Sequence, residues 1–310
     1  MEGFKVSIII PLYNREKYIS KAVESCINLP QTGEIIIIDD GSTDNSVNEA
    51  KKLATLYSKI KVLQHPDKKN HGCSAARNLG IKNAECSFIA FLDSDDQYLP
   101  NRFDNEERIF KQNPDIDGVY GITSTEFENQ EADKAYQSKI NYDIIKIREY
   151  IEPEKLYKSL LADDKGHFST DAITLKKKVF EKAGYFPEYL KIFEDVSTWI
   201  RIAATAKLIS NGINEPIAVR YVHNSNTILN SDDILLKSMD LMYETLFIWA
   251  LDQKFTFDKT NDFYIFYQGS RLKNKKELKF FLKFIINNPK YIFNPFSWRK
   301  TLQLLKQKAK

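Results

Sequence analysis

The sequence contains little cysteine. Three cysteines, Cys26, Cys73 and Cys86, occur in 310 residues, an odd number without the paired spacing of a zinc or redox site. This usage is typical of a reducing compartment, in which disulfides do not persist. We therefore interpret the three cysteines as small buried side chains, and we expect neither a disulfide framework nor a cysteine-ligated metal.

Long apolar runs and a signal peptide are missing as well. The best membrane candidate, Phe280 to Ile286, is interrupted by Lys283 and falls far short of the roughly 20 apolar residues that a spanning helix needs. The first residues hold a short apolar run that ends at Pro11, without the length or the cleavage site of a secretory signal. We expect a globular protein that stays in the cytoplasm and does not cross a bilayer.

Acidic residues are almost absent from the end of the chain. Twelve Lys or Arg residues accompany the single acid Glu277 between Arg271 and Lys310, so this tail carries +11. The rest of the chain carries −8, because the whole carries +3. Apolar residues recur at helical spacing in the tail, at Leu278, Phe281, Leu282 and Ile285. Such a basic amphipathic segment can lie on anionic lipid, while the alternative is a helical cap with a solvated basic face. No recognised nucleic-acid motif accompanies the charge, so nucleic acid is not an expected partner.

Runs of β-branched residues alternate with helical periodicity in the first part of the chain. Continuous apolar runs at Lys5–Leu12, Glu34–Asp39, Ile60–Gln64 and Ser87–Leu92 are typical of strands buried on both faces of a parallel sheet. The alternation predicts an α/β fold, in which a Rossmann-like, doubly wound and mostly parallel sheet carries helices on both faces. Further strands are expected at Gly118–Thr123, Ala172–Leu175 and Ile217–Tyr221. We assign residues 1–228 to this domain and residues 229–310 to a mainly helical, basic C-terminal extension.

Acidic residues gather where two of the predicted strands end, and in such sheets ligands bind beyond the carboxyl ends of the strands. Asp93, Asp95 and Asp96 follow one strand, and three carboxylates beside a core are costly unless a cation or solvent compensates them. A hard divalent ion shared with phosphate oxygens would do so, while the alternative is a solvated acidic turn. The run Asp39–Asp44 follows another strand; it can accept hydrogen bonds from a base or ribose, or it can simply cap a helix.

The chain resembles a known family in several ordered blocks. They are Val6–Asn14 (VSIIIPLYN), Ile38–Asp44 (IDDGSTD), Gly72–Gly80 (GCSAARNLG), Phe91–Asp96 (FLDSDD) and Phe193–Arg201 (FEDVSTWIR). In order and separation these blocks resemble the family 2 glycosyltransferases of the inverting, bacterial type, which have the GT-A fold. The resemblance extends over about Lys5–Asn226.

The resemblance implies a nucleotide site. Pro11, Tyr13 and Asp40 would hold the nucleoside, with Asp40 facing the base, which in the family is commonly uracil. The guanidinium of Arg77 would approach the nucleotide, as suits a planar, always charged group. Asp93 would lie near the ribose and the sugar.

The resemblance also implies a metal site and a catalytic pair. Asp95 would bind Mg²⁺ or Mn²⁺ that bridges the diphosphate, and His223 would touch the metal or the diphosphate, although a lone His is more often structural. Asp195 would be the catalytic base, with Glu194 beside it toward the sugar or the acceptor. The alternative for these two acids is a favourable charge in the first turn of a helix.

The implied activity is that of a metal-dependent, inverting hexosyl or glycosyltransferase. A sugar would pass from a nucleotide-diphosphate donor, by expectation a UDP-sugar, to a hydroxyl of a glycan or lipid-linked glycan, as in cell-surface polysaccharide synthesis. The enzyme would be cytoplasmic, with peripheral contact at the inner face of the cell membrane through the basic tail. A non-catalytic sugar-nucleotide-binding module is one alternative. A nucleotidyltransferase is less favoured, because Pro11 to Asn14 stand where a Gly-rich loop would be expected.

Overall fold

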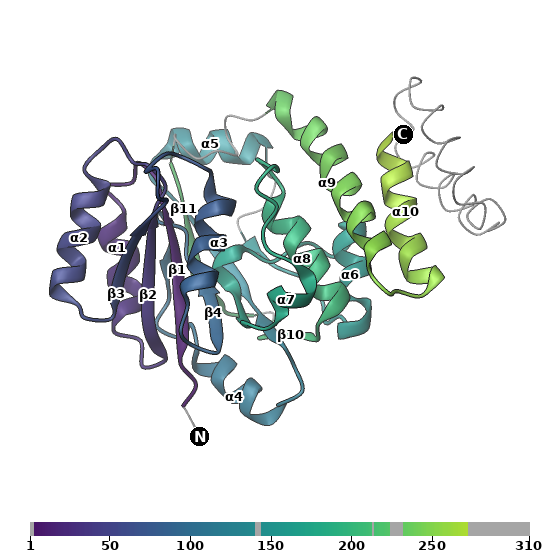
Figure 1. The fold of residues 1–310 in the computed structure, drawn as a ribbon, viewed down its shortest axis with the longest axis horizontal. Coiled ribbons are helices and arrows are strands. Elements are labelled where there is room, and N and C mark those ends of the chain that lie inside the picture. The colour runs from purple at the N-terminus through teal and green to yellow at the C-terminus, as the bar shows by residue number, and fades with distance from the viewer. Residues whose placement is uncertain (1–2, 140–143, 213, 224–231, 272–310) are drawn as a thin grey trace. The chain divides into compact units, whose positions relative to one another are not determined.

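The computed structural model describes residues 3–139, 144–212, 214–223 and 232–271. The chain divides into two compact units, Met1–Ser231 and Asp232–Lys310. The described part of the second unit consists of helices α9 (Asp232–Asp252) and α10 (Phe257–Arg271) (Figure 1). The predicted boundary after residue 228 and the basic tail after Arg271 lie outside the described residues.

A seven-stranded mixed sheet forms the centre of the first unit, in the order β10-β6-β9-β4-β1-β2-β3. Its strands are β1 (Val6–Leu12), β2 (Thr32–Asp39), β3 (Ile60–Gln64), β4 (Phe88–Phe91), β6 (Gly118–Tyr120), β9 (Ile173–Lys176) and β10 (Leu208–Ser210). β1 pairs in parallel with β2 and β4, and β2 pairs in parallel with β3. β9 alone of these strands runs antiparallel to its neighbours, β4 and β6.

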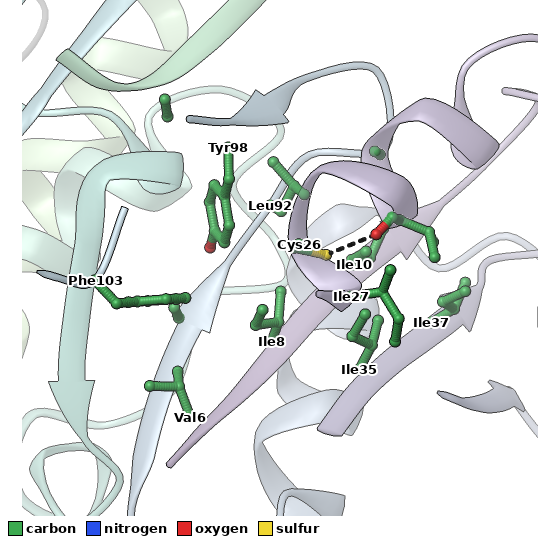
Figure 2. Close-up of a cluster of buried hydrophobic side chains, with 14 of the residues drawn as sticks. Val6, Ile8, Ile10, Cys26, Ile27, Ile35, Ile37, Leu92, Tyr98 and Phe103 are labelled. Atoms are coloured by element: carbon green, nitrogen blue, oxygen red, sulfur yellow. Dashed lines mark hydrogen bonds between the residues drawn. The ribbon is translucent and has the colours of Figure 1, made fainter. Parts of the chain in front are cut away.

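Helices cover both faces of the parallel half of this sheet, as the apolar runs predict. Ile8 and Ile10 of β1 share a buried cluster with Ile35 and Ile37 of β2 and with residues of α1 (Ile19–Ile27), as Figure 2 shows. Residues of α2 (Ser46–Leu56) belong to the same cluster. On the opposite face lies α3 (Cys73–Asn83), and a Cβ added at its Gly80 would lie 2.5 Å from Cγ2 of Ile9. Glycine at this position therefore allows α3 to approach β1 closely.

The cysteines meet the expectation only in part. Cys26 is fully buried in the cluster of Figure 2, where its Sγ donates to the carbonyl of Val23 at 3.4 Å. Cys86 is half-buried, and Cys73 is exposed. The prediction of a buried side chain is wrong for Cys73, because the residue opens α3 beside polar neighbours instead of facing the sheet.

A second, four-stranded sheet has the order β5-β11-β7-β8. Its strands are β5 (Gln97–Tyr98), β7 (Ile122–Phe127), β8 (Ile144–Ile145) and β11 (Pro216–Val222). The predicted strand Gly118–Thr123 is thus divided at Gly121 between β6 of the first sheet and β7 of the second. A Cβ at Gly121 would lie 2.5 Å from Cδ1 of Ile217, so glycine permits the close approach at which the chain changes sheets.

The first unit contains further helices between and after these strands. They are α4 (Asp104–Gln112), α5 (Gln130–Lys139), α6 (Pro153–Ala162), α7 (Val179–Ala183) and α8 (Glu194–Thr205), with a 3₁₀ turn at Thr170–Ala172. Across the described ranges, no helix has both the length and the apolar content that a membrane crossing requires.

Candidate active site

The acids that follow β4 have three different sets of partners. Asp93 accepts from the guanidinium of Arg77, and Asp95 contacts a cationic side chain and an imidazole. Asp96 is buried and accepts from the backbone N–H of Tyr221 at 2.8 Å. Because β5 directly follows these acids and pairs with β11, the loop lies beside the end of β11, where His223 follows Val222.

Asp95 and His223 meet at one carboxylate oxygen. His223 Nε2 lies 3.0 Å from Oδ2 of Asp95, and Arg15 Nε lies 2.8 Å from the same oxygen. The imidazole stacks on the ring of Tyr18, with 4.7 Å between centroids and an interplanar angle of 11°. Burial raises the pKa of Asp95, but the hydrogen bond from His223 and the charge of Arg15 outweigh it and hold the pKa below its usual range. Asp95 is therefore an ionised carboxylate with cationic or polar partners.

This donor set fits a divalent cation. A carboxylate oxygen from the loop after β4 and an imidazole nitrogen just past the end of β11 lie at hydrogen-bond distance, and the carboxylate is in the charged form that binds metal. The oxygen already attracts a guanidinium, so positive charge is favoured at this point. Asp95 and His223 thus have the chemistry for Mg²⁺ or Mn²⁺, and their role as ligands stays a prediction.

A second group of acids lies nearby. Ligand oxygens of Asp93, Asp96 and Asp171 lie within 4.8 Å of one another. Oδ1 of Asp171 accepts from the backbone N–H of Asp93 at 2.9 Å, and Oδ2 accepts from the hydroxyl of Ser169 at 2.8 Å. Burial, followed by the charges of Asp171 and Asp95, raises the pKa of Asp96 well above its usual range. This group is hydrogen-bonded within the protein, and a bound cation would relieve the repulsion between its carboxylates, so it is a second candidate for a cation beside the pair Asp95 and His223.

Arg77 connects this loop with the start of α8. Its Nη2 lies 2.7 Å from Oδ1 of Asp93, and its Nη1 lies 3.1 Å from Oε1 of Glu194. The side chain is only 5% exposed, and Cys73 Sγ donates to the same oxygen of Glu194 at 3.2 Å. Arg77 therefore joins two predicted site residues, and its approach to the nucleotide stays a prediction.

Glu194 and Asp195 open α8 in different environments. Glu194 is buried, and burial together with the adjacent Asp195 raises its pKa to about 7, against the effect of Arg77. Asp195 is half-buried; its Oδ2 accepts from the hydroxyl of Thr170 at 3.4 Å, and its Oδ1 accepts from the N–H of Val196. Glu194 is thus held by Arg77, while Asp195 has the weaker side-chain contact of the two.

The raised pKa of Glu194 makes stability depend on pH. Because the folded-state pKa of about 7 exceeds the ordinary 4.5, Glu194 favours its protonated form in the folded chain. The stability that it contributes is present in full below the unfolded pKa and is lost as the pH rises toward 7. Glutamine does not ionise, so its contribution to stability does not change with pH. We therefore expect the Tm of Glu194→Gln minus the Tm of the unchanged protein to be larger at pH 8 than at pH 5. Thermal melts at both pH values check this, with exposed Asp104→Asn as the control; an equal difference at the two pH values would contradict it.

The residues predicted to hold the nucleoside lie after β1 and β2. Asp40 is 2% exposed, and its two carboxylate oxygens accept from the N–H groups of His71 and Gly72, each at 2.8 Å. Pro11 is half-buried within β1, and the ring of Tyr13 is exposed. Asp40 therefore fixes the loop ahead of α3, and Tyr13 offers an open aromatic face.

The two loops are joined to each other through Asn14. Its Oδ1 accepts from the N–H of Thr43 at 2.8 Å, and its own N–H donates to the hydroxyl of Ser42 at 3.1 Å. Asn14 has φ of 52°, in the left-handed region that Asn tolerates better than most residues. The next residue, Arg15, then reaches Asp95, so the nucleoside loops and the acidic loop after β4 form one continuous site.

The family model described as glycosyl transferase family 2 matches residues 7–184. The chain belongs to glycosyltransferase family 2. An uncharacterized glycosyltransferase of Rickettsia felis is 32% identical over 228 residues, which are 73% of this chain and 34% of that protein. The chain thus spans about a third of the length of this relative. An uncharacterized glycosyltransferase of Haemophilus influenzae is 25% identical over 89% of this chain and 88% of its own length.

Solved structures show the fold of this family 2 chain. S. aureus TarS 1-349 in complex with UDP-GlcNAc matches it with a TM-score of 0.64 at 18% identity, over 97% of this chain and 79% of that chain. The same fragment in complex with UDP matches with a TM-score of 0.60 at 19% identity, over 98% of this chain and 82% of that chain. The predicted GT-A fold is confirmed.

Sequence reasoning missed three residues of the site in this family 2 member: Arg15, Tyr18 and Asp171. Arg15 and Tyr18 follow the loop after β1, and a basic residue directly after Asn14 was the available signal in the sequence. Asp171 precedes a predicted strand, at the end that holds no ligand in a parallel sheet. Because β9 runs antiparallel to β4, this end lies beside the carboxyl end of β4 instead.

Proposed function

We propose that the chain is an inverting glycosyltransferase that passes a sugar from a UDP-sugar, or another nucleotide-diphosphate donor, to a hydroxyl of a glycan or lipid-linked glycan. The observation that carries this proposal is a chain of contacts around the loop after β4. Asp95 of this loop contacts His223, and Asp93 of the same loop contacts Arg77, which also contacts Glu194. Family 2 membership supports sugar transfer as the reaction class. The TarS fragment, which has the same fold and was solved with UDP-GlcNAc, supports a UDP-sugar donor.

The residues of the two nucleoside loops bind and orient the donor. The exposed ring of Tyr13 can stack on a base, while Asp40 holds the loop ahead of α3 in place. Asp93 lies beside Arg77, so its carboxylate can accept a hydrogen bond from a ribose or sugar hydroxyl and still be compensated. Pro11 lies near the end of β1 and shapes the start of the loop that carries Tyr13.

Departure of the nucleotide requires compensation of the negative charge that develops on the diphosphate. Asp95 and His223 would hold Mg²⁺ or Mn²⁺, which supplies Lewis-acid stabilisation of that charge when bound. Tyr18 keeps the imidazole of His223 facing Asp95 by stacking on it. Arg77 adds fixed positive charge beside Asp93.

Attack by the acceptor hydroxyl requires a base. Asp195 is half-buried at the start of α8, and its carboxylate can accept the proton as the hydroxyl attacks the anomeric carbon. Glu194, held by Arg77, fixes the first turn of α8 and so orients Asp195. A single displacement of this kind inverts the configuration at the anomeric carbon.

Release of nucleoside diphosphate from a panel of nucleotide sugars, with Mn²⁺ and with or without candidate glycan acceptors, tests this function. We expect one UDP-sugar to be cleaved fastest and a hydroxyl acceptor to accelerate the cleavage. Binding without release of diphosphate would favour a non-catalytic sugar-nucleotide-binding module, and release of inorganic pyrophosphate from a nucleoside triphosphate and a sugar phosphate would favour a nucleotidyltransferase. Asp195→Asn is the matched control, since it should bind the donor without turning it over.

We further propose that residues 1–228 form the catalytic domain and that residues 229–310 form the helical, basic extension. In this proposal the enzyme works in the cytoplasm and contacts the inner face of the cell membrane through the tail, whose twelve basic residues suit anionic lipid. Co-sedimentation with anionic and with neutral liposomes tests the contact; equal binding to both would exclude the electrostatic attraction.

A further inference from the structure

One oxygen of Asp95 lies within hydrogen-bond distance of two nitrogens at once. Arg15 Nε lies 2.8 Å from Oδ2, and His223 Nε2 lies 3.0 Å from the same atom. The side chains of Arg15, Asp95 and His223 are 19%, 13% and 1% exposed, so solvent weakens these contacts only in part. A guanidinium and a divalent ion at this carboxylate repel each other at short range. Binding of either cation here therefore disfavours binding of the other.

The backbone of Arg15 is fixed, so any change of contact is confined to its side chain. Its N–H donates to the hydroxyl of Ser46 at 2.8 Å, at the start of α2. The preceding Asn14 is tied to Thr43, and the carbonyl of Asn14 accepts from Nη1 of Arg15 at 3.0 Å. The guanidinium is thus held by one contact within its own loop, to the carbonyl of Asn14, and by one contact to Asp95, and only the contact to Asp95 competes with a cation.

We propose that Arg15 is the internal counter-ion of the cation site. Its guanidinium neutralises Asp95 while no divalent ion is bound, leaves Oδ2 when the ion binds, and then contacts the diphosphate of the donor. The planar guanidinium suits phosphate oxygens and remains charged throughout. This inference rests on the proposed function, since cation and diphosphate are both part of it.

The movement of the Arg15 guanidinium from Asp95 to the diphosphate makes the binding of cation and nucleotide cooperative. A divalent ion that binds alone must displace Arg15 from Asp95 and leave the guanidinium without an anion. A diphosphate that binds together with the ion supplies a new anion, so each ligand increases the affinity for the other. A purely structural role makes the opposite prediction: if Arg15 only held Asp95 in position, its loss would weaken cation binding.

Calorimetric titration of the full chain with Mn²⁺, in the presence and absence of UDP, decides between these roles. We expect Arg15→Gln to bind Mn²⁺ without UDP about tenfold more tightly than the unchanged protein, a factor that corresponds to ~1.4 kcal/mol. UDP should increase the Mn²⁺ affinity of both proteins. We expect this increase to be about tenfold smaller in Arg15→Gln than in the unchanged protein, because the coupling through Arg15 is lost. Arg15→Lys, which keeps the charge on a more flexible stem, should give intermediate values.

Lys17→Gln is the matched control, because it removes the same charge from an exposed residue of the same segment. Its Mn²⁺ titration should equal that of the unchanged protein. Weaker or unaltered Mn²⁺ binding by folded Arg15→Gln and Arg15→Lys would overturn the inference, while normal UDP and Mn²⁺ binding by the unchanged protein would leave the proposed function standing. Failure of the unchanged protein to bind Mn²⁺ under any condition would overturn the inference together with the metal-dependent mechanism.

Discussion

Asp195→Asn is expected to reduce turnover by about 10²–10⁴-fold while UDP affinity stays close to that of the unchanged protein, which is the range that a general base contributes. Asparagine matches aspartate in size, and its amide oxygen can still accept from the N–H of Val196. The amide can also stay in contact with the hydroxyl of Thr170. The variant therefore keeps the shape of the first turn of α8 and loses the ability to accept a proton.

Turnover with the best donor and acceptor from the panel, together with calorimetric titration of UDP, checks this expectation. Asp104→Asn provides the control, because it makes the same chemical change at an exposed position in the first turn of α4. Near-normal turnover by Asp195→Asn would assign the base to another group. A parallel loss of UDP affinity would show instead that Asp195 supports the shape of the donor site.

The parallel half of the fold follows from the sequence for a simple physical reason. Strands that are covered on both faces by helices favour apolar side chains at consecutive positions, and β1 and β2 contain such runs at Ile8–Ile10 and Ile35–Ile38. The antiparallel β9 is a short, mostly buried strand with the sequence ITLK, and its composition does not reveal its direction. The division of one apolar run between β6 and β7 depends on the packing of Gly121 against Ile217, a contact between distant parts of the chain.

The site likewise has residues that the sequence predicts and partners that depend on the packing of distant segments. The acids after β2 and β4 were predictable, since strand ends meet at one edge of the sheet. The partners of these acids could not be predicted from the sequence. Arg15 reaches Asp95 because the contacts of Asn14 fix the loop after β1. Asp171 contacts Asp93 because β9 runs antiparallel to β4. Arg77 is buried even though charged residues on helices usually face solvent, because Asp93 and Glu194 both accept hydrogen bonds from its guanidinium from two other elements.

Asp95→Asn is expected to weaken Mn²⁺ binding and to reduce turnover by about 10³-fold, since a bound cation supplies several kcal/mol of charge stabilisation. The amide is neutral and is a poor ligand for a hard cation. It can still accept a hydrogen bond from His223 or Arg15, so the loop after β4 keeps its contacts to β11. Excess EDTA should inactivate the unchanged protein to a similar extent, and added Mn²⁺ should restore its activity but not that of the variant.

Asp171→Asn distinguishes the two acidic groups of the site. If the cation binds between Asp95 and His223, Asp171→Asn should retain Mn²⁺ affinity, because Asp171 is engaged with the N–H of Asp93 and the hydroxyl of Ser169. If it binds instead among Asp93, Asp96 and Asp171, this variant should lose Mn²⁺ and Asp95→Asn should retain it. Calorimetric titration of both variants with Mn²⁺ in the presence of UDP therefore locates the cation, and activity that survives EDTA in the unchanged protein would contradict metal dependence altogether.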